Sequence, residues 1–304
     1  MKLLWLDWDD GYTPRRVREA CRQLGIDGTF AQIDDLLFSA GGEPTGAVLD
    51  GCDIAAEYDV LVARAFHPRI SEILTVARLF KEAGKRVIDA SLTDEGFAVS
   101  KMHDYLILNA RGLPVPKTWQ AFTPEATEQI AAALGFPVVL KGVHGSYGSH
   151  VHLARDVAEL RAHQSAYERG ELMVQEYLPA PGDFRVLTVG YRALPALVER
   201  TPPPGDFRTN AALGSRLAAR PTAAYPDLAA LAEQSARALR REFAAVDMRF
   251  KGSAPLVLEV NRRPAFRNYE LATGADVAGR FLRYVAERVS GANEAPLALA
   301  VDDA

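Results

Sequence analysis

The sequence predicts an α/β protein of two domains, and three observations lead to this prediction. Over residues 1–96, short apolar strands alternate with amphipathic helices, a pattern typical of a parallel sheet covered by helices. Residues 97–304 mix helices, β-branched runs and a glycine-rich loop, and they include a hairpin over 243–261 with acids on one face. A length of 304 residues suits about two domains.

The composition limits the classes of function. Hydrophobic residues make up 48% of the chain and charged residues 24%, as in soluble globular proteins. The net charge of -4 argues against a general nucleic-acid binder. Two cysteines, Cys21 and Cys52, allow neither a disulfide framework nor a zinc finger. No apolar run approaches the ~20 residues of a membrane span, and the N-terminus turns acidic too early for a signal peptide. We expect a reduced, cytoplasmic protein with neither nucleic acid nor membrane as a partner.

The first domain is predicted from its strand and helix signals. Residues 2–6 form a short apolar strand, and Thr13, followed by proline, is the expected N-cap of a helix. Strands over 59–64 and 86–90 flank a helix over 70–84. The apolar stripe of the first helix is formed by Val17, Ala20, Cys21 and Leu24.

The second part alternates helices with strands less regularly. Asp156 is the expected cap of a helix over 157–169, and Thr123 starts another helix. Residues 201–222 are rich in proline, glycine and alanine, which indicates an irregular loop over a site. Further helices are expected over 101–111, 227–242 and 276–289, and strands over 137–141, 151–153, 172–178 and 185–199.

The hairpin over 243–261 is a candidate metal site. With residues 251–255 as its turn, Asp247 falls opposite Glu259, and Asn261 shares their face. Two carboxylates across a ladder repel each other, and a divalent cation would reverse that interaction. Oxygen ligands of this kind suit Mg²⁺. The alternative is a solvent-facing hairpin with scattered acids. The opposite, buried face would hold Leu256, Leu258 and Val260.

A glycine-rich loop follows the strand 137–141. Lys141 ends the strand, and Gly145 and Gly148 could turn backbone N–H groups toward an anion. Ser146 adds a hydroxyl donor. The loop does not match a Walker A motif, and a flexible hairpin turn is the alternative interpretation.

Together, these segments resemble the ATP-grasp superfamily, and within it the RimK-like carboxylate–amine ligases, which act on glutamate and peptides. The resemblance runs from about residue 86 to 289. It is carried by Lys101 before GLPVPKTW, Lys141 before GSYG, LMVQEYL, PGDFRV, ERTPPPGDFRTN and LVLEVN. It implies an ATP-grasp fold with two α+β subdomains that enclose the nucleotide. The expected divisions are a Rossmann-like (pre-ATP-grasp) α/β domain over 1–96 and an ATP-grasp domain over 97–304, with a lid subdomain at about 115–175 and a C-terminal subdomain at about 176–290.

The resemblance also implies roles for particular residues. The residues expected to hold the nucleotide are Lys101, Lys141, Gly145, Ser146, Tyr147, Gly148, Glu176, Tyr177 and Asp183. Those expected to act in catalysis are Arg208, Asn210 and Arg200. The magnesium ligands it implies are Asp247, Glu259 and Asn261, in agreement with the hairpin argument.

The activity implied is ATP- and Mg²⁺-dependent ligation, with Mn²⁺ as an alternative ion. A carboxylate substrate would form an acylphosphate, and an amine substrate would then give an amide or peptide bond. An amino acid such as glutamate, joined to a peptide, a protein tail or a small amino acid, fits this family, as does a homo-oligomer. His150, Arg262 and Arg263 depart from the family pattern and leave the substrate open. A kinase acting on a hydroxyl group and a non-catalytic nucleotide-binding regulator are the alternatives.

Overall fold

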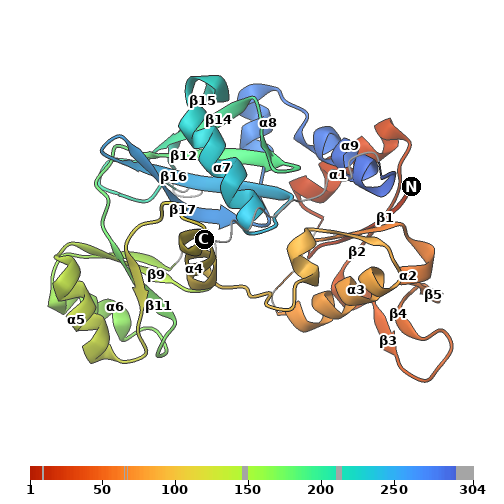
Figure 1. Ribbon diagram of the computed structural model, residues 1–304, viewed down its shortest axis with the longest axis horizontal. Helices are drawn as coiled ribbons and strands as arrows, with labels where there is room; N and C mark the ends of the chain where they lie inside the picture. Colours follow the sequence, from red (N-terminus) through yellow and green to blue (C-terminus); the bar gives the residue numbers. More distant parts are fainter. Residues whose placement is uncertain (9, 65, 67, 146–149, 210–213, 292–304) are drawn as a thin grey trace, which may run out of the picture. The chain divides into compact units, whose positions relative to one another are not determined.

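The computed structural model describes residues 1–8, 10–64, 66, 68–145, 150–209 and 214–291. Within it the chain divides into two compact units (Figure 1). The first unit contains residues 1–94 together with the C-terminal segment that begins at Asp276. The second unit contains residues 95–275. The first unit is therefore built from both ends of the chain.

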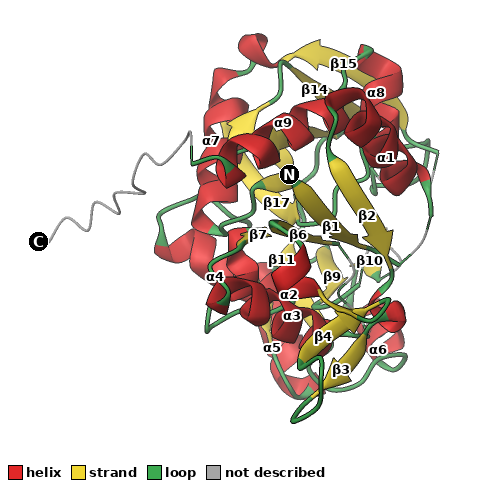
Figure 2. Cartoon of the chain, turned by 90° about the vertical axis from the view of Figure 1, so that its right-hand side faces the viewer, coloured by secondary structure: helices red, strands yellow, loops and turns green. Residues whose placement is uncertain are grey.

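The first unit has the predicted parallel α/β sheet, with strand order β2-β1-β6-β7. A second, antiparallel sheet of order β3-β4-β5 was not predicted. Helices α1 and α9 pack side by side (Figure 2). The strands are β1 (Lys2–Leu6), β2 (Asp27–Ala31), β3 (Leu37–Ser39), β4 (Gly46–Leu49), β5 (Cys52–Asp53), β6 (Val60–Ala63) and β7 (Arg86–Ile88). The helices are α1 (Tyr12–Leu24), α2 (Ile54–Glu57), α3 (Ile70–Glu82) and α9 (Val277–Val289).

The first helix begins earlier than predicted. Thr13 is not its N-cap, because Gly11 caps the helix with extended backbone and no side-chain bond. Proline lacks an N–H that the first turn would leave unsatisfied in any case, so Pro14 fits beyond the first helical position. Of the predicted apolar stripe, Leu24 is 37% exposed while the other three side chains are buried.

The second unit contains two antiparallel sheets. The smaller has strand order β10-β9-β11-β8, and helices α5 and α6 cover its apolar face. Its strands are β8 (Thr118–Gln120), β9 (Val138–Gly142), β10 (Val151–Ala154) and β11 (Leu172–Glu176). Its helices are α5 (Pro124–Leu134) and α6 (Val157–Gln164). Thr123 and Asp156 cap these helices as predicted. The predicted helix over 157–169 is too long, because α6 ends at Gln164.

The larger sheet has the order β15-β14-β12-β16-β17, with β13 paired to β12. Helix α7 packs on its apolar face. Its strands are β12 (Asp183–Val189), β13 (Arg192–Ala193), β14 (Ala196–Thr201), β15 (Arg216–Pro221), β16 (Phe243–Lys251) and β17 (Ala254–Asn261). The other helices of the unit are α4 (Lys101–Ala110), α7 (Pro226–Ala238) and α8 (Arg267–Thr273). The prediction of an irregular loop throughout 201–222 is wrong, because β15 pairs with β14 at the sheet edge, where a proline can end a strand.

The turn of the β16–β17 hairpin is shorter than predicted. The prediction of a turn over 251–255 is wrong, because Lys251 already pairs with Ala254. Only Gly252 and Ser253 connect the two strands. Gly252 has a φ of 63°, and tight hairpin turns favour glycine at such positions. This shorter turn alone would shift the whole register by one residue.

A β-bulge restores the predicted alignment of the two acids. Met248 pairs with Val257, but the next pair in the ladder is Asp247 with Glu259. Leu258 is therefore the extra residue of the bulge, with no partner in the ladder. The predicted pairing of Asp247 and Glu259 is confirmed, although it arises from two compensating features.

The bulge also changes which side chains face the core. Asn261 lies opposite Ala245, as predicted. Leu258 lines a pocket, so its predicted place on the buried face is wrong. Val257 takes its place in the core beneath α7, beside Val260, whose predicted burial is confirmed.

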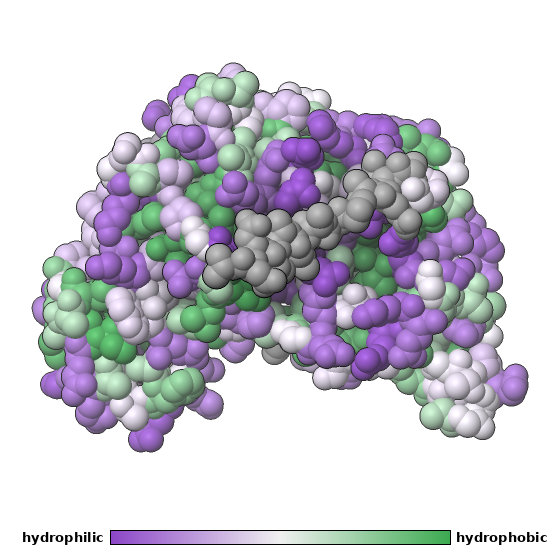
Figure 3. Space-filling model, viewed as in Figure 1, coloured by the Kyte–Doolittle hydropathy of each residue, from purple (hydrophilic) through white to green (hydrophobic). Residues whose placement is uncertain are grey.

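The surface carries both hydrophilic and apolar side chains. On the face shown in Figure 3, hydrophilic side chains are spread between smaller apolar patches. Within the described part of the chain, no helix has the length and apolar character needed to cross a membrane.

Candidate functional site

A pocket lies between the two sheets of the second unit. It spans about 870 Å³, a volume that includes the part open to solvent. Its walls come from the start of α4, from β9 and β11 of the smaller sheet, and from β12, β14, β16 and β17 of the larger one. The predicted residues that line it are Lys101, Lys141, Gly145, Glu176, Tyr177, Asp183, Arg200, Arg208, Asp247 and Glu259. Residues far apart in the sequence thus share one cavity.

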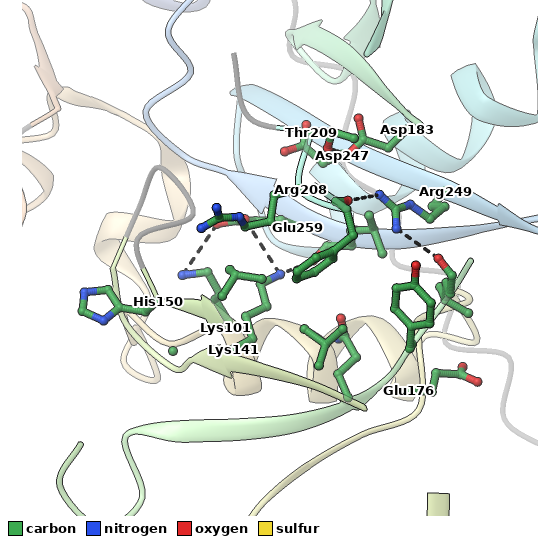
Figure 4. A pocket seen from close by; sticks show the side chains of 18 of the residues that line it. Lys101, Lys141, His150, Glu176, Asp183, Arg208, Thr209, Asp247, Arg249 and Glu259 are labelled. Atoms are coloured by element: carbon green, nitrogen blue, oxygen red, sulfur yellow. Dashed lines mark hydrogen bonds and ion pairs between the residues drawn. The ribbon is translucent and has the colours of Figure 1, made fainter. Parts of the chain in front are cut away.

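Two lysines meet one carboxylate inside the pocket. The Lys101 ammonium lies 3.7 Å from Glu259 Oε1, and the Lys141 ammonium lies 3.9 Å from Oε2. Figure 4 shows both side chains pointing toward Glu259. Burial lowers the pKa of Lys101, an effect that Glu259 opposes and the charge of Lys141 reinforces. Two adjacent ammonium groups with a single carboxylate between them favour a further anion.

The bulge holds one of these lysines in place. The carbonyl of Leu258 accepts a hydrogen bond of 2.8 Å from Lys141 Nζ and one of 2.5 Å from the Tyr105 hydroxyl. Gln175 Nε2 donates to the same hydroxyl at 3.0 Å. Because the bulge leaves Leu258 outside the ladder, its carbonyl is available to bind these groups. The bulge therefore connects β17 to β9, β11 and α4.

Asp247 is surrounded by arginines. Arg185 binds both of its carboxylate oxygens at 2.7 Å, and Arg200 Nη2 lies 3.2 Å from Oδ1. Burial alone would raise the pKa of Asp247, but these two guanidinium groups hold it well below its ordinary value. Arg200 also binds Asp183 through two bonds of 2.6 and 2.8 Å. The repulsion expected between Asp247 and Glu259 is thus offset by a separate set of cations around each acid.

The donor set fits a magnesium ion in type, although Arg185 occupies both oxygens of Asp247 in this structure. Asp247 and Glu259 face each other across the ladder, and Asn261 Nδ2 lies 3.3 Å from Asp247 Oδ2. Carboxylate and amide oxygens are the ligands that Mg²⁺ prefers, together with substrate phosphates. The described residues contain no group of three or more His, Cys, Asp or Glu residues placed to hold a metal by themselves. The arrangement therefore suits an ion that is completed by a bound phosphate.

Arg208 is held by its own loop. Its Nε lies 3.1 Å from Asp206 Oδ1 and its Nη2 lies 2.8 Å from Oδ2, while its backbone N–H donates to Oδ1 at 2.9 Å. Thr209 in the same loop donates its hydroxyl to Asp183. Arg208 lines the pocket. Its guanidinium could therefore bind a phosphoryl group there if it released the Asp206 carboxylate.

The segment after β11 forms another wall of the pocket. Glu176 accepts a bond of 3.0 Å from the backbone N–H of Lys117 and one of 2.5 Å from Lys251 Nζ. Tyr177 meets the ring of Phe207 edge-on, with 6.1 Å between centroids. We call residues 176–178 the hinge segment; they supply backbone groups and an aromatic face, as a planar base would require.

The glycine-rich loop is described only at its two ends. Gly145 has a φ of 99°, and its carbonyl accepts a 2.6 Å bond from Lys101 Nζ. A Cβ on Gly145 would lie 3.0 Å from the ring of His150, whose Nδ1 is 3.1 Å from the Tyr167 hydroxyl. The predicted residues that fall outside the described part of the chain are Ser146, Tyr147, Gly148 and Asn210.

Sequence reasoning missed two arginines of the site, Arg185 and Arg249. The two-residue period of strands could have revealed Arg249 from the sequence. Arg249 follows Asp247 by two residues on β16, and Arg185 lies directly opposite Asp247 on β12. No local pattern in the sequence shows which strand lies beside β16, so Arg185 could be found only from the order of strands in the sheet.

Arg262, one of the departures from the family pattern, contacts the start of the second unit. Its Nη2 donates to the carbonyl of Ala98 at 3.2 Å, and its guanidinium lies 4.6 Å from the ring centroid of Phe97. It is not among the residues that line the pocket.

Comparisons with known proteins agree with this geometry. A family model described as RimK-like ATP-grasp domain matches residues 98–285. The chain is 31% identical to "Probable alpha-L-glutamate ligase" of Serratia proteamaculans, over 91% of this chain and 92% of the relative. It is 33% identical to "Ribosomal protein bS6–L-glutamate ligase" of Escherichia coli, over 63% of this chain and 66% of the relative. The ATP-grasp ligase PsnB, solved with a minimal precursor, Mg and ADP, has the same fold, with a TM-score of 0.72 at 17% identity, covering 95% of this chain and 98% of that one.

Proposed function

The chain belongs to the RimK-like ATP-grasp family, and on that premise we propose that this ATP-dependent carboxylate–amine ligase joins an amino acid such as L-glutamate to a peptide, a protein tail or a small amino acid. Relatives named as glutamate ligases that match more than nine-tenths of the chain support the choice of amino acid. The observation that carries the proposal is the pocket in which Lys101 and Lys141 converge on Glu259.

In the proposed first step, an oxygen of the substrate carboxylate attacks the γ-phosphorus of ATP. The bond to the bridging oxygen breaks, giving an acylphosphate and ADP. In the second step, the amine nitrogen attacks the acyl carbon, phosphate leaves, and the nitrogen releases a proton to solvent. The protein contributes positioning and charge neutralisation rather than a side-chain nucleophile.

Each part of the pocket has a proposed task in these steps. Lys101 and Lys141 neutralise the phosphates, and Arg208 stabilises charge on the transferring phosphoryl group. The hinge segment receives the base of the nucleotide. Asp247 and Glu259, together with Asn261, would hold Mg²⁺ or Mn²⁺, and the ion would supply positive charge beside the phosphates.

Phosphate release across a panel of amino acids and short peptides tests this proposal, with mass spectrometry of the products. We expect stoichiometric ADP, phosphate and an amide product that contains glutamate. Hydroxylamine added without the amine should give a hydroxamate, which a kinase acting on a hydroxyl group would not form. Phosphorylated alcohol instead of amide, or a product that never contains glutamate, would contradict the respective part of the proposal.

A further inference from the structure

Arg249 is a buried cation without an acidic partner. Its residue is 7% exposed and lines the pocket. Its Nη1 donates to the carbonyl of Leu178 at 3.0 Å, and its Nη2 donates to the carbonyl of Phe207 at 3.4 Å (Figure 4). Among the residues that the structure describes, no carboxylate forms an ion pair with this guanidinium; Asp183 attracts it from a greater distance, but that carboxylate is bound by Arg200. The arginine therefore joins two main-chain segments rather than balancing a charge.

This arrangement contributes little to stability by itself. Carbonyl groups do not neutralise a buried charge, and burial lowers the pKa of Arg249, an effect that the Asp183 carboxylate opposes only in part. Other buried arginines of this unit have acids, since Arg200 binds Asp183 and Arg241 binds Asp104. An apolar side chain of similar length would avoid the desolvation of a charge. A role in holding the two carbonyls explains the guanidinium better than a role in the core.

The two segments that Arg249 joins are the hinge segment and the loop of Arg208. The carbonyl of Phe207 and the N–H of Arg208 belong to one planar peptide group. Arg249 binds that group from the carbonyl side, and Asp206 binds it from the N–H side at 2.9 Å. The edge-on contact of Tyr177 with Phe207 is a second link between the same segments. The peptide plane that leads into Arg208 is thus tied to the hinge.

We propose that Arg249 is a positioning residue that couples nucleotide binding at the hinge segment to the placement of Arg208. A nucleotide base that orders residues 176–178 fixes the Leu178 carbonyl, and through Arg249 it fixes the peptide group of Phe207. The guanidinium fork reaches both carbonyls at once, which an ammonium group cannot do with the same geometry. The proposal rests on the roles proposed above for the hinge segment and for Arg208.

Hydrogen exchange measured with and without Mg·ADP tests the coupling without any turnover. In the wild type, we expect the nucleotide to slow exchange both in the hinge segment and at residues 207–209. In Arg249→Met, protection of the hinge should remain while protection of the loop is lost, and Arg249→Lys should be intermediate. Arg220→Met is the matched control, because Arg220 pairs with Glu199 on an exposed edge of the same sheet; it should behave as wild type. Unchanged loop protection in a folded Arg249→Met variant would overturn the proposal.

A double-mutant cycle tests whether Arg249 acts through Arg208. Arg249→Met should lower the single-turnover rate about tenfold or more, the usual effect of losing a charge-assisted bond. In an Arg208→Lys background, the same change should lower the rate less than about twofold, because its target is already absent. Equal losses in the two backgrounds would refute the coupling. If the wild type forms no amide at all, the substrate proposal fails, while the exchange experiment still decides the role of Arg249.

Discussion

The two acids of this pocket, Glu259 and Asp247, each have their own set of positively charged neighbours. Glu259 lies between two lysines, whereas Asp247 lies between two arginines. The two acids lie opposite each other in the ladder, but replacing them should affect stability differently because their neighbours differ. Asp247 compensates the buried Arg200 and the partly buried Arg185, while Glu259 is the more exposed acid and faces Lys101 and Lys141.

We expect Glu259→Gln to fold normally and to lose metal-dependent turnover by ~100-fold or more, as for loss of a group that stabilises transition-state charge. Asp247→Asn should lose turnover as well, but it should also destabilise the protein by on the order of 3 kcal/mol, because it leaves Arg185 and Arg200 beside a neutral amide. Thermal melts and Mg²⁺ titrations of both variants measure these effects. An Asp247→Asn protein that melts like the wild type would disprove the structural part of this account.

Arg208 provides the sharpest test of the proposed chemistry at this scale. Its planar fork is held against Asp206, and a lysine cannot reproduce that geometry toward a phosphoryl group. Arg208→Lys should bind ATP within about twofold of wild type and lose ~10²–10³ in single-turnover rate. Arg220→Lys, on the exposed sheet edge, is the control and should keep full activity. A rate within a fewfold of wild type would remove Arg208 from the mechanism.

At the scale of elements, the β-bulge at Leu258 determines how the two sheets of the second unit meet. It turns a main-chain carbonyl toward Lys141 and Tyr105 and at the same time sets Asp247 opposite Glu259. One irregular residue thus aligns the two acids of the proposed metal site and binds Lys141.

Removal of the Tyr105 hydroxyl should show this connection. Tyr105→Phe deletes bonds to Leu258, Lys141 and Gln175, so we expect a loss of ~1–3 kcal/mol in stability and several-fold weaker Mg·ATP binding. Tyr269→Phe is the control, because its hydroxyl bonds the backbone of Ala196 away from the pocket. That variant should lose stability and keep nucleotide affinity. Calorimetry on both proteins distinguishes them, and equal losses of affinity would contradict the proposed anchor.

The sequence predicted the helices and strands better than it predicted the turn, the bulge and the order of strands in the sheet. The alternation of strands and helices, the capped helix starts at Thr123 and Asp156, and the pairing of Asp247 with Glu259 are confirmed. The short turn at Gly252 and the bulge at Leu258 were not predicted, because each shifts the register by one residue and only their sum is visible in the spacing of the acids. The arginines around Asp247 depend on the order of strands in the sheet, and a single sequence does not encode that order in any local pattern.

At the scale of the whole molecule, the first unit is discontinuous in sequence. Helix α9 belongs to it and packs on α1, and Phe281 meets Trp5 edge-on at 6.3 Å. The described residues that line the pocket all come from the second unit, which is continuous from 95 to 275. Stability of the first unit and nucleotide binding by the second should therefore be separable.

Truncation after Ala275 tests this separation. It removes the buried side chains of Val277, Phe281, Leu282 and Val285, each of which contributes ~1.5–3 kcal/mol. We expect residues 1–94 to become sensitive to proteolysis and to exchange rapidly, while Mg·ATP still protects residues 95–275. A chain ended after Gly291 keeps α9 and is the control. Protease resistance of residues 1–94 in the shorter chain would contradict the assignment of α9 to the first unit.

The discontinuity of the first unit has a consequence during synthesis on the ribosome. Strands β1, β6 and β7 emerge first, but about 180 residues must still be translated before α9 appears. At ~5–20 residues per second, that interval lasts roughly 10 to 40 s. The continuous second unit can fold during this time, whereas the N-terminal unit leaves the apolar surface of α1 and its sheet exposed to solvent or to chaperones. The part of the nascent chain that is made first is thus the last to complete its core.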